Sequence, residues 1–168
     1  MTISGLKRIA GFMLVLSLAL SCVSEEENTT DETSNEKTLF TLLPSEQTGI
    51  DFLNKVENQK NFNIFKYRNF YNGGGVAIGD INNDGLADIY MTGNMVSNRL
   101  YLNKGNLKFE DISEKAGVKG SKPWSTGVVM VDINQDGFLD IYVSNAGNMK
   151  ANNHDNDLYI NNGDLTFT

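Results

Sequence analysis

The sequence predicts an all-β protein built from a repeated unit of about four short strands. Three observations support this prediction. A nine-residue acidic loop occurs twice, at 80–88 and 132–140. Each copy lies between two short apolar runs that are rich in β-branched and aromatic residues, as strands require. A hairpin-like sequence also occurs twice, at 98–109 and 156–167. About four strands in some fifty residues is the size of one blade of a β-propeller.

The first 21 residues form a predicted export signal. Lys7 and Arg8 provide a basic start, and a run of twelve mostly apolar residues follows, from Ile9 to Leu20. Twelve helical residues span about 18 Å, which is short of the roughly 30 Å of a bilayer core. We therefore expect a cleaved signal peptide over 1–21 and no transmembrane anchor.

Cys22 is the only cysteine, so no intramolecular disulfide can form. Its position directly after the apolar run resembles the lipid-modified cysteine of a bacterial lipoprotein. Ala19 and Leu20 depart from the usual lipoprotein pattern at this site, and cleavage by ordinary signal peptidase is the alternative. The resemblance implies a membrane partner through lipidated Cys22 and an exported, outer-membrane location.

Residues 22–37 are expected to form an acidic, disordered tether, because their one apolar residue, Val23, cannot build a core. The run 24–27 also resembles the acidic signal that directs some lipoproteins of Bacteroidota-type bacteria to the cell surface. A solvated charge run with no such role is the alternative. Either interpretation places the folded region downstream of the tether.

Residues 38–69 alternate apolar and polar side chains without an acidic loop. They are predicted to form a lead-in β segment of short strands broken at Pro44 and Gly49. The segment would be either a separate lead-in element or the outer strands of the first blade. The sequence leaves both arrangements open.

The two acidic loops, within 70–168, are the predicted metal sites. Oxygen-bearing side chains occupy positions 1, 3, 5 and 9 of each loop, with glycine at position 6, and calcium prefers six to eight oxygen ligands. The predicted ligands are Asp80, Asn82, Asp84, Asp88 and the carbonyl of Leu86, with Asp132, Asn134, Asp136, Asp140 and the carbonyl of Phe138 in the second loop. Ordinary hairpin turns are the alternative. An EF-hand is excluded, because its twelfth position would be Met91 or Val143.

These paired loops and their flanking strands resemble the FG-GAP and VCBS repeats, whose calcium-binding propeller blades are similar to those of integrin α-subunits. The resemblance runs from about Phe70 to the end and implies about two blades, the second truncated. The family's phenylalanine-glycine pair is poorly kept, since Gly74-Gly75 and Thr126-Gly127 occupy that region. The stretch 70–75 is similar to surface lipoproteins of Bacteroidota-type bacteria. A complete propeller would need further blades from additional sequence, because known propellers have at least four.

Other function classes find little support. The formal net charge is −7 and no basic patch suggests nucleic acid. The glycines at 73–75 lack the lysine of a phosphate-binding loop and are interpreted as permitting close backbone approach. His154 is interpreted as a solvated loop residue, with a metal or ligand contact as the alternative. Trp124 is interpreted as a packing residue, with sugar stacking as the alternative.

The sequence therefore predicts a non-enzymatic, calcium-binding repeat module of an exported cell-envelope lipoprotein. Such a module would act in ligand binding, adhesion or scaffolding, with a protein or glycan as its ligand. The alternative is a non-catalytic propeller portion of a larger envelope enzyme that acts on polysaccharide. A downstream domain with catalytic carboxylates would favour that alternative.

Overall fold

A computed structural model describes residues 39–146 and 155–168, and Thr41–Thr168 forms one compact unit. The expected signal peptide (1–21), Cys22, the tether and His154 lie outside the described residues. Strands in antiparallel sheets dominate the unit, so the predicted all-β class is confirmed. In the part of the chain that the structure describes, no helix is long and apolar enough to cross a membrane.

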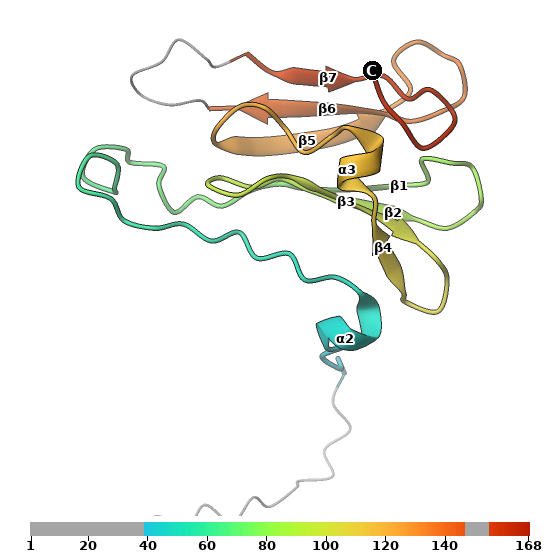
Figure 1. Cartoon of the computed structure of the whole chain (residues 1–168), viewed down its shortest axis with the longest axis horizontal. Helices are drawn as coiled ribbons and strands as arrows, with labels where there is room; N and C mark the ends of the chain where they lie inside the picture. The colour runs from blue at the N-terminus through green and yellow to red at the C-terminus, as the bar shows by residue number, and fades with distance from the viewer. Residues whose placement is uncertain (1–38, 147–154) are drawn as a thin grey trace, which may run out of the picture. The chain divides into compact units, whose positions relative to one another are not determined.

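The first sheet is a four-stranded antiparallel meander (Figure 1). Its strands follow chain order, and the helix α3 (Ser113–Ala116) comes directly after the last one. The strands are β1 (Val76–Gly79), β2 (Asp88–Met91), β3 (Arg99–Asn103) and β4 (Phe109–Asp111). The first acidic loop joins β1 to β2, as predicted, and the 98–109 hairpin contains β3 and the first residue of β4.

The second sheet repeats this plan with three strands, β5 (Ser125–Val131), β6 (Asp140–Asn145) and β7 (Asp157–Tyr159), in the order β5-β6-β7. The second acidic loop joins β5 to β6. In the place where the first sheet has β4, an isolated bridge pairs Asn161 with Phe167. The described residues thus contain two blade-like sheets and not a closed propeller.

The hydrophobic core lies between the two sheets. Tyr90 and Leu100 of the first sheet are fully buried against Ile141 and Val143 of the second. Strands β1 and β5 are the neighbouring strands of the two sheets. Each fully buried aliphatic side chain contributes roughly 1.5–3 kcal/mol, so this interface is a main source of stability.

The strands expected in the lead-in segment are not present. Residues 41–69 instead contain one short helix, α2 (Ser45–Thr48), and an isolated bridge between Gln59 and Phe62. Pro44 and Gly49, interpreted as strand breakers, are the two ends of α2, and Gly49 closes it with a φ of 78°. Leu42, Leu53 and Phe65 of this segment are exposed, and its aromatic rings Phe62 and Tyr67 pack on Trp124 instead of pairing in a strand.

Trp124 is the centre of that packing and is only 2 % exposed. The rings of Phe62 and Tyr67 meet its indole edge-on at centroid distances of 4.9 and 5.3 Å, and Phe70 lies at 5.4 Å. The packing interpretation of Trp124 is therefore confirmed. A buried indole has no open face on which a sugar could stack.

The close backbone approach expected at the triple glycine is also present. A Cβ on Gly74 would lie 2.0 Å from the Thr92 carbonyl oxygen, and one on Gly75 would lie 2.6 Å from the Thr126 carbonyl oxygen. Thr126 belongs to β5, so Gly75 allows the two sheets to meet backbone to backbone.

Candidate metal-binding loops

The first acidic loop is closed by its own carboxylates. Asp80 accepts hydrogen bonds from the backbone N–H of Asp84 at 3.1 Å and of Gly85 at 2.7 Å. Gly85 adopts a φ of 84°, a left-handed conformation that glycine reaches without steric cost, and no other atom would obstruct a Cβ there. Backbone conformation is therefore what requires glycine at position 6.

The remaining side chains of this loop are linked to one another. Asp84 accepts from the backbone N–H of Leu86 at 2.8 Å, and Asn82 donates its amide to Asp84 at 3.0 Å. Positions 1, 3 and 5 thus share one connected hydrogen-bond network at the exposed end of the sheet.

The second loop repeats this network bond for bond. Asp132 accepts from Asp136 N at 3.1 Å and from Gly137 N at 2.9 Å. Asp136 accepts from Phe138 N at 2.9 Å, and Asn134 donates to Asp136 at 2.8 Å. Two separate sequences reach the same geometry, so the loop pattern itself specifies the conformation.

The position-9 aspartates, Asp88 and Asp140, are buried and bind backbone N–H groups. Asp88 accepts from Ile81 at 2.9 Å and from Asn103 at 2.8 Å. Asp140 accepts in the same way, from Ile133 at 2.9 Å and Asn161 at 2.8 Å. Each aspartate therefore connects the start of its loop to a distant part of the same sheet. Asp88 reaches the third strand, β3, and Asp140 reaches the residues directly after the third strand, β7.

Burial raises the pKa of Asp88 above its usual range, and the charges of Asp84 and Asp80 raise it further. The hydrogen bonds from Asn103 and Ile81 oppose this rise by stabilising the ionised form. A positive ion near the loop would relieve the repulsion among these carboxylates.

The donor chemistry of both loops fits a hard cation, because every predicted side-chain ligand offers oxygen and a carboxylate has about four acceptor sites. The loop side chains do not form a complete coordination shell. Within 39–146 and 155–168, no three His, Cys, Asp or Glu side chains are grouped as metal ligands. The carboxylates of Asp88 and Asp140 accept hydrogen bonds from backbone N–H groups. To coordinate calcium, the loop side chains would have to share or exchange some of these hydrogen bonds.

Two asparagines connect the loops across the sheets. Asn83 of the first loop donates to the carbonyl of Gly137 in the second at 3.0 Å. Asn161 donates to the carbonyls of Ile81 at 2.8 Å and Leu139 at 3.1 Å. These roles were not predicted from the sequence. The occurrence of asparagine at the same place in both hairpin sequences, Asn103 and Asn161, was the available signal.

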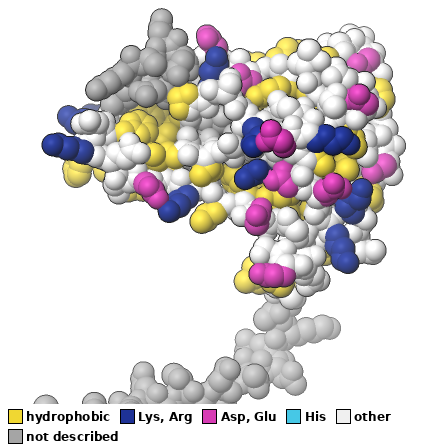
Figure 2. Space-filling model, in the orientation of Figure 1, with side chains coloured by type: hydrophobic (Ala, Val, Ile, Leu, Met, Phe, Trp, Pro, Cys, Tyr) yellow, Lys and Arg dark blue, Asp and Glu magenta, His cyan; other side chains and the backbone are white. Residues whose placement is uncertain are grey.

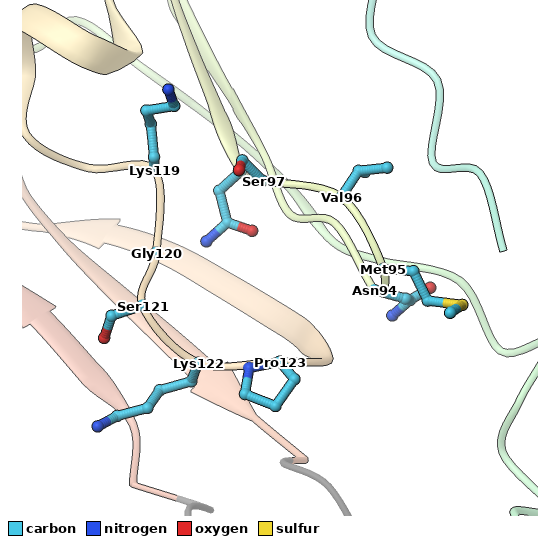
Figure 3. A pocket seen from close by; sticks show the side chains of 10 residues that line it. Asn94, Met95, Val96, Ser97, Lys119, Gly120, Ser121, Lys122 and Pro123 are labelled. Atoms are coloured by element: carbon cyan, nitrogen blue, oxygen red, sulfur yellow. The ribbon is translucent and has the colours of Figure 1, made fainter. Parts of the chain in front are cut away.

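A shallow cavity of about 350 Å³ lies between residues 94–98 and 119–123 (Figure 3). Its lining includes Lys119 and Lys122, whose side chains point away from each other in Figure 3. The lining contains neither a carboxylate, a histidine nor a cysteine. Figure 2 shows basic and acidic side chains interspersed on the viewed face, without a continuous basic surface.

The fold and the duplicated loops define a repeat protein with antiparallel, blade-like sheets. In the comparison with known families, residues 80–143 match the FG-GAP-like repeat. The matched segment begins at the first acidic loop and ends within β6, so it includes both loops. FG-GAP repeats indicate a module of the ligand-binding or adhesion type.

Three curated proteins are similar to a part of the chain. Cartilage acidic protein 1 of Xenopus tropicalis is 38% identical over 78 residues, which is 46% of this chain and 12% of that protein. The proteins of the same name from Mus musculus and Homo sapiens are each 36% identical, over 73 and 76 residues. These matches cover 44% and 45% of this chain, and 11% and 12% of the two relatives. The chain thus matches only about an eighth of the length of these relatives.

Proposed function

We propose that this chain is a calcium-stabilised, non-enzymatic repeat module that binds a protein or glycan ligand or acts as a scaffold. The observation that carries the proposal is the duplication of one hydrogen-bonded acidic loop in two neighbouring sheets. Each loop also brings three carboxylates close together, and a bound cation would offset their mutual repulsion.

In this proposal, the ligands of the first ion are Asp80, Asn82, Asp84, Asp88 and the Leu86 carbonyl. Asp132, Asn134, Asp136, Asp140 and the Phe138 carbonyl serve the second. Calcium would supply the positive charge that stabilises each loop at the end of its sheet. Because Asn83 and Asn161 join the two loops, occupation of one site would also order the other.

The cellular context belongs to the same proposal. The basic start, the short apolar run and Cys22 support an exported lipoprotein of Bacteroidota type, anchored in the outer membrane. Stable anchoring requires more than one acyl chain, because a single chain gives only marginal binding. A Cys22→Ser variant should lose membrane partitioning in detergent phase separation. Equal partitioning of both forms would contradict lipidation.

Calorimetric titration with calcium, combined with thermal unfolding, tests the metal proposal. At a calcium concentration of 100 times Kd, each occupied site should add about 2.7 kcal/mol to the free energy of unfolding. Asp84→Ala and Asp136→Ala should each remove one binding event. Glu46→Gln is the matched control, because it removes an exposed carboxylate of α2 outside both loops. No binding heat and an unchanged transition in chelator would contradict the proposal.

A further inference from the structure

Asparagine followed by glycine is the dipeptide that deamidates most readily, and the chain contains it twice, at Asn72-Gly73 and Asn162-Gly163. In this reaction the backbone nitrogen of the glycine attacks the side-chain amide of the asparagine, and glycine has no side chain to obstruct the approach. Both glycines have a positive φ, 80° at Gly73 and 78° at Gly163. The two sites are therefore alike in sequence and in backbone conformation, and only their hydrogen bonds distinguish them.

The second site is restrained at both reacting groups. Asn162 Nδ2 donates to Thr166 Oγ1 at 3.0 Å, and Asn162 Oδ1 accepts from Thr168 Oγ1 at 2.9 Å. The backbone N–H of Gly163, which would be the attacking group, donates to Asn161 Oδ1 at 2.9 Å. Neither the amide nor the attacking nitrogen is free to move in the folded chain.

The first site has none of these restraints. Asn72 is exposed, and in the part of the chain that the structure describes neither its side-chain amide nor the N–H of Gly73 has a hydrogen-bond partner. A Cβ placed on Gly73 would meet no atom within 4 Å, so the space around this residue is open. Only the backbone N–H of Asn72 is fixed, by a bond to the Asn69 carbonyl at 3.1 Å. Both reacting groups are thus available to each other.

We propose that Asn72 is a site of spontaneous deamidation, and that its conversion to isoaspartate loosens the junction between the lead-in segment and the two sheets. The Gly73 nitrogen loses its proton and attacks Asn72 Cγ. The N–Cγ bond forms, the Cγ–Nδ2 bond breaks, and the amide nitrogen takes up a proton and leaves as ammonia. Water then opens the resulting succinimide ring at one of its two carbonyls. The products are aspartate and isoaspartate, so a carboxylate replaces a neutral amide.

Isoaspartate lengthens the backbone by one carbon atom, and here the added atom falls between two anchored residues. On one side, Phe70 is fully buried and packs on Trp124. On the other side, the Gly73 carbonyl accepts a hydrogen bond from Asn94 Nδ2 at 3.1 Å. The longer backbone therefore displaces at least one of these contacts.

Asn94 extends the effect to the rest of the junction. Its Nδ2 also donates to the Ser125 carbonyl of β5 at 3.0 Å, and its Oδ1 accepts from Asn54 Nδ2 of the lead-in segment at 2.8 Å. A shift of Gly73 would disturb this one amide, which connects the lead-in segment, the entry to β1 and the start of β5. Conversion of an exposed residue thus acts on a buried hydrogen-bond network.

Peptide mapping by mass spectrometry, on the full chain aged at mildly alkaline pH, tests the reaction. In the folded protein Asn72 should convert, and Asn162 should react about a hundredfold more slowly, because its hydrogen bonds must open first. The same chain in urea is the matched control, and both asparagines should convert there at similar rates. Equal rates at the two sites in the folded protein would overturn the proposal. So would an Asn72 that stays intact in the folded protein while it converts in urea.

Thermal unfolding of the aged protein tests the structural consequence. Ion-exchange chromatography separates the deamidated chains by their added charge, and labelling by an isoaspartyl methyltransferase identifies isoaspartate in them. The isoaspartate form should have a lower Tm than the intact chain. Freshly prepared Asn72→Asp adds the charge without lengthening the backbone and should retain its Tm.

An Asn72→Gln chain should keep its Tm on ageing, because glutamine would have to form a larger ring and reacts more slowly. An isoaspartate form with an unchanged Tm would overturn the proposed loosening of the junction. An equal loss of Tm in the Asn72→Asp chain would also overturn it, since the added charge and not the longer backbone would then be the cause.

Discussion

At the scale of single residues, the acidic loops combine two kinds of aspartate. Asp80 and Asp84 lie at the exposed end of the sheet and hold the turn together, whereas Asp88 is buried and satisfies two backbone N–H groups. A buried donor without a partner costs about 1–3 kcal/mol, and an exposed one is satisfied by water. The position-9 aspartates are therefore structural residues even without a cation.

This division predicts different costs in the absence of calcium. In excess chelator, Asp88→Ala should lower the free energy of unfolding by about 2–4 kcal/mol, because Ile81 N and Asn103 N lose their acceptor. Asp84→Ala, the matched exposed control, should cost less than about 1 kcal/mol. Urea denaturation measures both values. Equal costs would mean that Asp88 has no special role in the metal-free fold.

The sequence was sufficient to predict that each acidic loop joins two strands, but not all of the bonds that the loop side chains make. Aspartate at position 9 was assigned to the metal alone, since spacing does not show that Asp88 and Asp140 meet N–H groups of the third strand or the residues after it. Contacts between residues far apart in the chain, such as Asn161 with Ile81, depend on how the sheets stack. No local pattern contains that information.

At the scale of elements, the strands were predictable where apolar residues flank a repeated loop. The lead-in segment was not, because a short apolar run with Pro44 and Gly49 fits strand ends and helix ends alike. Aromatic packing on Trp124 determines where the lead-in segment lies. The contact of β1 with β5 likewise depends on Gly75, which the sequence marked only as a place of close approach.

Gly75→Ala should destabilise the contact between the sheets. The added Cβ would lie 2.6 Å from Thr126 O, so β5 would have to move, at a cost of about 1–3 kcal/mol. Gly127→Ala is the matched control at the equivalent position of the second sheet, where the nearest atom would be Ser144 Oγ at 3.8 Å. Thermal unfolding at low protein concentration should show a lower Tm for the first variant only. An equal loss at both positions would indicate a general effect of alanine in these strands.

At the scale of the whole molecule, the two sheets are joined at the loop end by a buried amide. Asn161 donates to Leu139 within its own sheet and to Ile81 in the other. Its counterpart Asn103 donates to Ala87 within the first sheet. The chain therefore contains asparagine at two equivalent positions, of which Asn161 makes a hydrogen bond between the sheets and Asn103 makes one only within its own sheet.

Asn161→Ala should cost about 1 kcal/mol more than Asn103→Ala in the free energy of unfolding, which is the typical contribution of one hydrogen bond. The larger effect should also appear as weaker coupling between the two proposed calcium-binding events, since the Ile81 carbonyl belongs to the first loop. Denaturation curves and calorimetric titration of the two variants supply both comparisons. Identical behaviour would mean that the bond between sheets contributes nothing measurable.

The position of Trp124 also has a spectroscopic consequence. It is the only tryptophan in the chain, and its indole is enclosed by Phe62, Tyr67 and Phe70. Its fluorescence emission therefore reports on one junction, where the lead-in segment meets the start of β5. Phe62→Ala should shift that emission to longer wavelength by admitting water to the indole, while leaving the two acidic loops unchanged. A single optical signal can thus follow detachment of the lead-in segment separately from calcium binding.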